Sequence, residues 1–260
     1  MLILKNSFIG FLLSFQFFSS LPIRKQLPMN QKTVSAMYAM LPALGILMGG
    51  TISVLYLVNE QYLQLTNLLF AILVVIAGIV MTGGLHLDGW IDMGDAYFSY
   101  QDKARRLEIL EDPRVGAFGA ISLVVLVLLK IGFVFELLHN DSEGIIIFFI
   151  AVPLLSRLGL LVYFVTTHTI KEKGLAAYFK SQVNPQKIWT AFTIYTLLFA
   201  IITYFYIGIV SYVLVTCLLV FVTLYRKWTI KNFGGMTGDL AGALNEVLEV
   251  FLWGIIVLFI

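Results

Sequence analysis

The feature that most constrains this chain is a series of long apolar runs separated by short polar connections. The run Val34–Val58 contains no charged residue and exceeds the ~20 residues that a helix needs to cross the hydrocarbon layer of a bilayer. Six more runs follow: Leu65–Thr82, Ala117–Leu138, Gly144–Val165, Ile188–Tyr206, Ile207–Tyr225 and Leu240–Ile260. The sequence therefore predicts an all-α, polytopic integral membrane protein with about seven transmembrane helices.

The amino-acid composition agrees with this fold class and limits the kinds of binding partner that we expect. Of 260 residues, 60% are hydrophobic and only 12% are charged, which is far from the average of soluble proteins. In such a chain a net charge of +2 is no signal for nucleic acid, so we expect membrane lipid and small molecules as partners and leave a homo-oligomer open. The single cysteine, Cys217, lies in an apolar run and predicts neither a disulfide nor a thiolate metal site. We expect one membrane-embedded catalytic domain over residues 1–260.

The N-terminal segment Met1–Ser20 has a different character. It is apolar but interrupted by polar residues, it lacks a signal-peptide cleavage site, and Pro22, Arg24 and Lys25 follow it. This pattern is typical of an interfacial or partly inserted helix, with a full span as the alternative.

The cations predict the orientation. Nearly all of the 17 lysines and arginines fall before the first span or in alternate connections, whereas the connections near residues 59–64, 139–143 and 208 carry none. By the positive-inside rule, the connections around residues 82–119, 166–187 and 226–239 are cytoplasmic. We therefore expect a multi-pass protein of the cytoplasmic membrane with its active site on the cytoplasmic side.

An acidic motif, residues 82–119, holds much of the chemistry. Asp88, Asp92 and Asp95 are spaced i, i+4, i+7, which places them on one face of a helix. Carboxylates at this spacing suit a hard cation such as Mg²⁺, which takes one or two carboxylates together with substrate phosphates. His86 precedes the acids and is a candidate general base or phosphate contact.

Cations follow the acids within the same motif. Arg105, Arg106 and Arg114, near Asp112, form a patch of the kind that holds phosphate oxygens. Arg114 follows Pro113 and precedes Gly116, so we expect it on a turn, free for bidentate contact with a diphosphate. The alternative is an ordinary solvated charged loop in which, for example, Arg105 pairs with Glu108. Frequent glycines favour a ligand site because they permit close approach of backbone.

Ionisable groups inside predicted spans are costly and mark function. Arg157 has no acid at i±3 or i±4, so we expect a partner across helices, either a phosphate or an aspartate of the motif. Lys130 and Glu136 are left outside the site because both could extend to the interface. A second motif, residues 234–249, combines a glycine-rich turn with Asp239, which could bind a ligand or only cap the helix, and with polar residues deeper in it: Asn245, Glu246 and Glu249.

Three segments together identify a resemblance: GGLHLDGWIDMGDA (83–96), RRLEILEDPRVGAFG (105–119) and GGMTGDLAGALNE (234–246). In this order they closely resemble the cobalamin synthase family, the adenosylcobinamide-GDP ribazoletransferases, over the whole chain. The resemblance implies a Mg²⁺-dependent membrane enzyme with the second motif in its active site. Two departures, residues 96–100 and Pro113, affect the expected loop shape but not the acids.

The predicted reaction is attack of a ribose hydroxyl of α-ribazole, or its 5'-phosphate, on the diphosphate of adenosylcobinamide-GDP, with release of GMP and formation of adenosylcobalamin or its 5'-phosphate. The candidate catalytic residues are His86, Asp88, Asp92 and Asp95. The candidate metal ligands are Asp88, Asp92, Asp95 and Asp239. The candidate substrate or phosphate contacts are Arg105, Arg106, Asp112, Arg114, Arg157 and Asn245.

Two other functions stay open. A CDP-alcohol-type lipid phosphotransferase also holds Mg²⁺ on aspartates, but its pattern differs because Asp92 and Asp95 follow Asp88-Gly89 too closely. A cation transporter would line the midplane of several spans with acids, whereas here the acids cluster with arginines in one segment.

Overall fold

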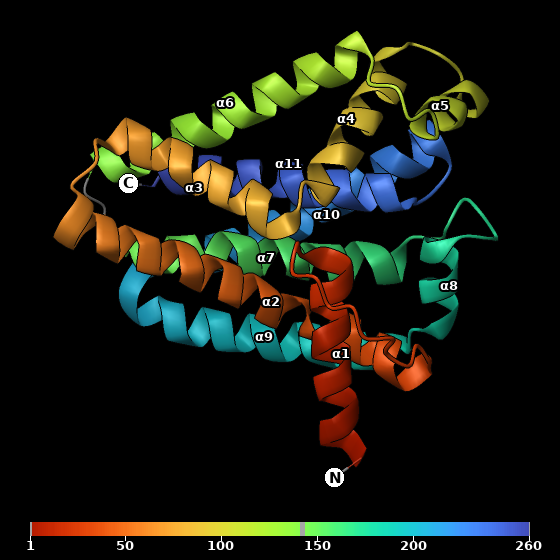
Figure 1. Cartoon of the computed structure of the whole chain (residues 1–260), viewed down its shortest axis with the longest axis horizontal. Coiled ribbons are helices and arrows are strands. Elements are labelled where there is room, and N and C mark those ends of the chain that lie inside the picture. The colour runs from red at the N-terminus through yellow and green to blue at the C-terminus, as the bar shows by residue number, and fades with distance from the viewer. Residues whose placement is uncertain (1, 141–143, 260) are drawn as a thin grey trace.

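The computed structural model describes residues 2–140 and 144–259, and over these ranges it is built from helices (Figure 1). The helices are α1 (Leu2–Phe18), α2 (Gln31–Val58), the π-helical turn η1 (Asn59–Leu63), α3 (Asn67–Thr82), α4 (Leu85–Phe98), α5 (Lys103–Leu110), α6 (Ala117–His139), α7 (Ile145–Thr166), α8 (Leu175–Gln182), α9 (Pro185–Ile207), α10 (Val210–Phe233) and α11 (Gly238–Val257). The prediction of an all-α protein is confirmed.

The predicted number of spans is also confirmed. Among the described residues, α2 with η1, α6, α7, α9, α10 and α11 are each long and apolar enough to cross a membrane. The bent pair α3 and α4 provides a seventh candidate. The predicted turn at 206–208 lies where α9 ends, at a glycine with φ +55°. Met1, Ile260 and residues 141–143 of one cation-free connection lie outside the described residues.

A sharp corner separates α3 from α4, whose axes differ by 96°. Two consecutive glycines form it, Gly83 at φ +66° and Gly84 at φ +75°, in the left-handed region that residues with a Cβ seldom adopt. The apolar helix α3 runs with the other long helices, whereas α4 turns across one end of the bundle (Figure 1). We therefore treat α3 as the membrane-crossing part and α4 as lying outside the span.

Helix α1 crosses the direction of α2 and packs on it (Figure 1). The two backbones approach closely at Gly10, where an added Cβ would lie 2.5 Å from atoms of Ala36. The segment after α1 reaches the α3–α4 corner, because the Ser20 amide donates to the carbonyl of Met81 at 2.9 Å. Helix α1, with 17 described residues, is not among the candidate spans found in the described part of the chain.

Helix α7 is the centre of the bundle, buried over most of its length against α2, α9, α10 and α11. Its apolar side chains, including Phe149, Leu155 and Tyr163, belong to the main hydrophobic core. A polar side chain on α7 must therefore find its partners inside the protein.

The predicted cation-bearing connections gather at one end of the bundle, together with α4, α5 and α8 (Figure 1). Lys171, in the α7–α8 connection, pairs with Glu111 of the acidic motif at 2.6 Å. Arg106 of α5 donates to Asn232 at the end of α10 at 2.9 Å. These contacts place the three connections on the same side of the protein.

Candidate active site

The two sequence motifs meet where α4 crosses the start of α11. Gly89 makes this approach possible, since a Cβ added there would lie 2.4 Å from the backbone oxygen of Asp239. The contact brings Asp88 and Asp92 of α4 beside Asp239, in the first turn of α11. Segments about 150 residues apart therefore bring three carboxylates close together.

Asp239 is not the N-cap of α11. That role belongs to Thr237, whose hydroxyl accepts a hydrogen bond of 3.2 Å from the amide of Leu240. The alternative that Asp239 serves only as a cap is therefore wrong. Asp239 is the second residue of α11 and lies in its first turn, where partial positive charge favours a carboxylate.

The carboxylates of this site are close enough to repel one another. Burial and the neighbouring charges of Asp88, Asp239 and Asp95 raise the pKa of Asp92 to about 7. An oxygen-rich donor set under mutual repulsion fits a hard divalent cation, whose charge would relieve it. In the part of the chain that the structure describes, no group of three or more His, Cys, Asp or Glu side chains is arranged so that it could hold a metal ion by itself. Mg²⁺ does not need one, because it keeps waters and substrate phosphates as ligands.

Asp95 is placed differently from the other acids. Its carboxylate accepts hydrogen bonds from the amides of Gly116, at 2.7 Å, and Gly119, at 2.8 Å. It therefore caps the start of α6, and the expected convergence of Asp88, Asp92 and Asp95 on one point is not observed. The glycines leave room for this carboxylate, because an added Cβ at Gly119 would lie 2.3 Å from it. They permit packing within the chain where we had expected close approach of a ligand.

A cavity of about 300 Å³ adjoins the acids. Its polar edge is formed by His86, Asp88, Thr237 and Asp239, and its other walls are mostly apolar. Aromatic side chains from four helices contribute to these walls: Phe17, Phe18, Tyr38, Phe164 and Phe179. A cavity with one charged edge and aromatic walls suits a ligand that joins a phosphate to an apolar ring.

His86 lines this cavity and is buried. Its Nδ1 lies 3.1 Å from the side-chain nitrogen of Asn245 on α11. Helix α11 presents Gly242 to the backbone of His86, where a Cβ would lie only 3.3 Å away. The two residues that the sequence proposed from separate motifs are thus in direct contact.

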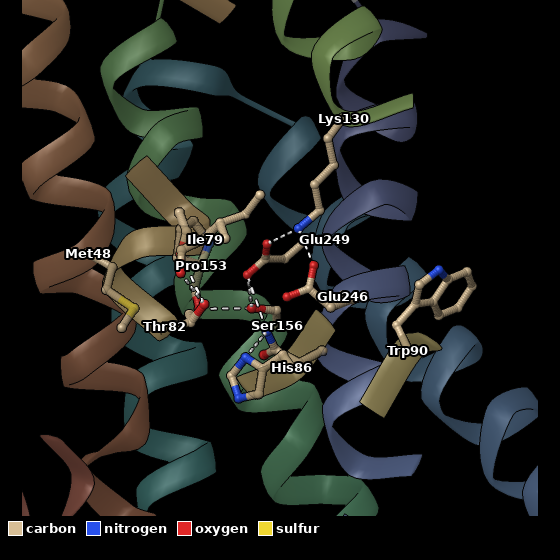
Figure 2. A network of polar contacts seen from close by, with 12 residues as sticks. Met48, Ile79, Thr82, His86, Trp90, Lys130, Pro153, Ser156, Glu246 and Glu249 are labelled. Carbon is tan, nitrogen blue, oxygen red and sulfur yellow. Dashed lines mark hydrogen bonds and ion pairs between the residues drawn. The ribbon is translucent and has the colours of Figure 1, made fainter. Parts of the chain in front are cut away.

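Lys130, Glu246 and Glu249 lie near His86 (Figure 2) and form a buried network of charged side chains together with Arg157. Lys130 of α6 extends to Glu246 at 2.6 Å and to Glu249 at 2.8 Å. Arg157 of α7 pairs with the other oxygen of Glu249 at 2.5 Å. Ser156 completes the network, accepting from Arg157 at 2.9 Å and donating to Glu249 at 3.3 Å.

This network corrects two predictions. Lys130 does not extend to the interface, because its amine lies between two carboxylates in the interior. Arg157 finds its partner across helices, as expected, but the partner is Glu249 and not an aspartate of the acidic motif. Two cations and two anions balance, which is how buried charges are tolerated in a membrane.

The arginines of the acidic motif all have partners within the chain. Arg105 pairs with Glu108 one turn along α5, the structural role considered above. Arg106 contacts Asn232 and lies over the ring of Tyr97, 5.1 Å from its centroid.

Arg114 was expected to be free, but it forms a bidentate pair with Asp112, at 2.9 and 2.6 Å. This pair lowers the pKa of Asp112 to about 2. Both side chains are open to solvent, where ion pairs contribute little to stability.

Comparison with known proteins supplies the reaction. The family model for cobalamin-5-phosphate synthase matches residues 10–257. The chain belongs to this family. It is 35% identical over 255 residues to an adenosylcobinamide-GDP ribazoletransferase of Geobacillus kaustophilus, covering 97% of each chain. It is 36% identical to that of Geobacillus sp. strain WCH70, covering 96% of this chain and 95% of the relative. A Clostridioides difficile relative with the same name is 32% identical, covering 92% and 93%.

Membership of the cobalamin-5-phosphate synthase family supports the predicted transferase over the lipid phosphotransferase and the cation transporter. No solved structure matches the chain. The roles of the individual site residues therefore depend on the geometry described above.

Sequence reasoning missed Lys130 and gave Glu246 and Glu249 too little weight. A signal was available, because the predicted spans contain two cations, Lys130 and Arg157, and three acids, Glu136, Glu246 and Glu249. Charges inside a bilayer are expected to pair. The sequence alone did not give the helix packing that decides which of them meet.

Proposed function

We propose that this chain transfers α-ribazole, or its 5'-phosphate, to adenosylcobinamide-GDP at the cytoplasmic face of the membrane and releases GMP. The observation that carries the proposal is the contact of α4 with α11, which brings Asp88 and Asp239 together at the edge of the cavity, with Asp92 close to both. The full-length similarity to ribazoletransferases supports the choice of substrates. The cation-bearing connections at the same end of the bundle support a cytoplasmic location.

In this reaction a ribose hydroxyl oxygen forms a bond to the corrinoid-side phosphorus of the diphosphate. The bond from that phosphorus to the bridging oxygen breaks, GMP leaves with the bridging oxygen, and the hydroxyl proton is lost. The reaction is a phosphodiester-forming displacement that needs no redox partner.

We further propose that Mg²⁺ binds to Asp88, Asp92 and Asp239. When bound, it would neutralise charge on the diphosphate and stabilise the leaving GMP. Asp95 is less suited to this role because its carboxylate already accepts two backbone hydrogen bonds.

The remaining residues bind and orient the substrates. The aromatic walls of the cavity exclude water and hold an apolar ring next to the acids. Arg114 can exchange Asp112 for a substrate phosphate, since the pair lies at the surface. An aspartate that is not engaged with the cation can take the hydroxyl proton.

The test is GMP release by the purified full chain in lipid nanodiscs, supplied with adenosylcobinamide-GDP, α-ribazole and Mg²⁺. We expect GMP and the cobalamin product in equal amounts, and no release when EDTA replaces Mg²⁺. Release that is independent of α-ribazole, or no release at all, would contradict the proposed function. Light scattering on the same preparation measures whether the enzyme is a homo-oligomer.

A further inference from the structure

The buried network determines how the side-chain amide of Asn245 is oriented. One atom of this amide lies 3.4 Å from Oε1 of Glu249 and 3.1 Å from Nδ1 of His86. Glu249 is held ionised by Arg157 on one oxygen and by Lys130 on the other. A carboxylate only accepts hydrogen bonds, so the atom of Asn245 that faces it is the NH₂ group. Its two hydrogens can then be donated to Oε1 of Glu249 and to Nδ1 of His86.

This orientation fixes the proton on the imidazole of His86. Because Asn245 donates to Nδ1, that nitrogen must carry a lone pair and no hydrogen. In a doubly protonated ring, the N–H at Nδ1 would face the NH₂ group of Asn245, and two donors would oppose each other. The neutral ring therefore carries its hydrogen on Nε2, a buried nitrogen with no partner among the described residues.

The unpartnered nitrogen belongs to a ring that lines the cavity beside Asp88 and Asp239. A buried donor without an acceptor is uncommon in proteins and calls for an explanation, which a ligand oxygen would supply. A neutral imidazole with Nε2–H donates a hydrogen bond but has no lone pair to take a proton. In this tautomer His86 cannot act through Nε2 as the general base that the sequence suggested as one of its two roles.

We propose that His86 is a neutral hydrogen-bond donor to a phosphate or sugar oxygen of the bound substrate, and that Asn245 and Glu249 are positioning residues that fix its tautomer. The identity of the acceptor depends on the proposed function, whereas the tautomer does not. Lys130 and Arg157 contribute by keeping Glu249 ionised and in place.

Two amide substitutions separate donation from general-base catalysis. The amide nitrogen of Gln reaches the position of Nε2, whereas that of Asn reaches only that of Nδ1. We expect His86→Asn to lose about 10²–10³-fold in kcat for GMP release, as for loss of one transition-state donor, and His86→Gln to be at least about tenfold more active than His86→Asn. Equal inactivity of His86→Gln, His86→Asn and His86→Ala, with melting temperatures like the parent, would overturn the donor role.

The tautomer is measured without substrate by ¹⁵N NMR of the full chain labelled at histidine. The chain has three histidines, and His139→Gln and His168→Gln assign the other two signals. We expect an unprotonated Nδ1 and a protonated Nε2 at His86. In Asn245→Asp, whose carboxylate accepts, the proton should move to Nδ1, and in Asn245→Ala both tautomers should appear.

A protonated Nδ1 in the parent protein, or the same tautomer in Asn245→Ala and Asn245→Asp as in the parent, would overturn the positioning role. If the parent protein showed the expected tautomer but released no GMP, the proposed function would fail and the inference about Asn245 and Glu249 would stand. If the parent protein released GMP but carried its proton on Nδ1, the proposed function would stand and the inference about Asn245 and Glu249 would fail.

Discussion

The carboxylate of Asp95 accepts a hydrogen bond of 2.7 Å from the backbone amide of Gly116, at the start of α6. A second bond, from the amide of Gly119, makes Asp95 a cap supplied by a different helix. Three aspartates that the sequence groups together therefore differ in role. Asp95 joins α4 to α6, whereas Asp88 and Asp92 remain beside Asp239.

Replacing the cap should cost stability. Asp95→Asn keeps one acceptor but sets its NH₂ group against a backbone donor, so we expect a loss of about 1–2 kcal/mol and a lower melting temperature in detergent micelles. The matched control is Asp92→Asn, also on α4, which should melt no lower than the parent. Equal melting temperatures for Asp95→Asn and the parent would show that the cap contributes nothing.

Asp92 should matter for activity and not for stability. Its ionised carboxylate is destabilised by its neighbours, so Asp92→Asn removes repulsion while it also removes a proposed metal ligand. We expect GMP release to fall by orders of magnitude, with a higher Mg²⁺ requirement and an unchanged or raised melting temperature. Near-normal turnover would indicate a structural role for this face of α4.

Arg114 should bind substrate phosphate in exchange for Asp112. Since Lys lacks the planar fork, Arg114→Lys should raise KM for adenosylcobinamide-GDP more than Arg105→Lys, in which the changed residue pairs within α5. Both variants are compared in the same nanodiscs. Equal and mild effects would mean that Arg114 only pairs with Asp112.

The α4–α11 contact should tolerate no side chain at Gly89. The Cβ of Gly89→Ala would lie 2.4 Å from a backbone oxygen of Asp239, so the helices must separate and the acids with them. We expect a loss of at least about 10²-fold in GMP release, because small displacements of catalytic groups are costly. Gly78→Ala on α3 has no neighbour within 4 Å of the new Cβ and should be active. Similar activities of the two variants would argue against this packing.

Removing one charge of the buried network without its partner should strongly destabilise the protein. Lys130→Met leaves Glu246 without its partner, at a cost of about 3–5 kcal/mol, which should appear as a lower melting temperature and a lower yield of folded protein. Lys130→Met combined with Glu246→Gln restores the charge balance, since Arg157 and Glu249 remain. The double variant should recover at least half of the lost stability. A double variant as unstable as Lys130→Met would show that the charges are not coupled.

The sequence by itself determined that the chain lies in a membrane, which segments are helical and which class of reaction to expect. Long charge-free runs such as Val34–Val58 leave no alternative to membrane-crossing helices, because apolar length and period are local properties. The acids near Asp88 and the second motif around Asp239 are likewise read from local spacing, and both lie at the site.

Only the tertiary structure decided which polar groups meet. The spacing of Asp95 matches that of Asp88 and Asp92, but the start of α6 takes its carboxylate. Lys130 looked like a residue that reaches the interface, until the packing of α6 on α11 enclosed its amine between Glu246 and Glu249. The Nδ1 atom of His86 contacts Asn245, 159 residues away in sequence, and Nε2 has no partner among the described residues. Hydrogen bonds and ion pairs act over a few ångströms, so such partnerships follow from helix packing and not from spacing along the chain.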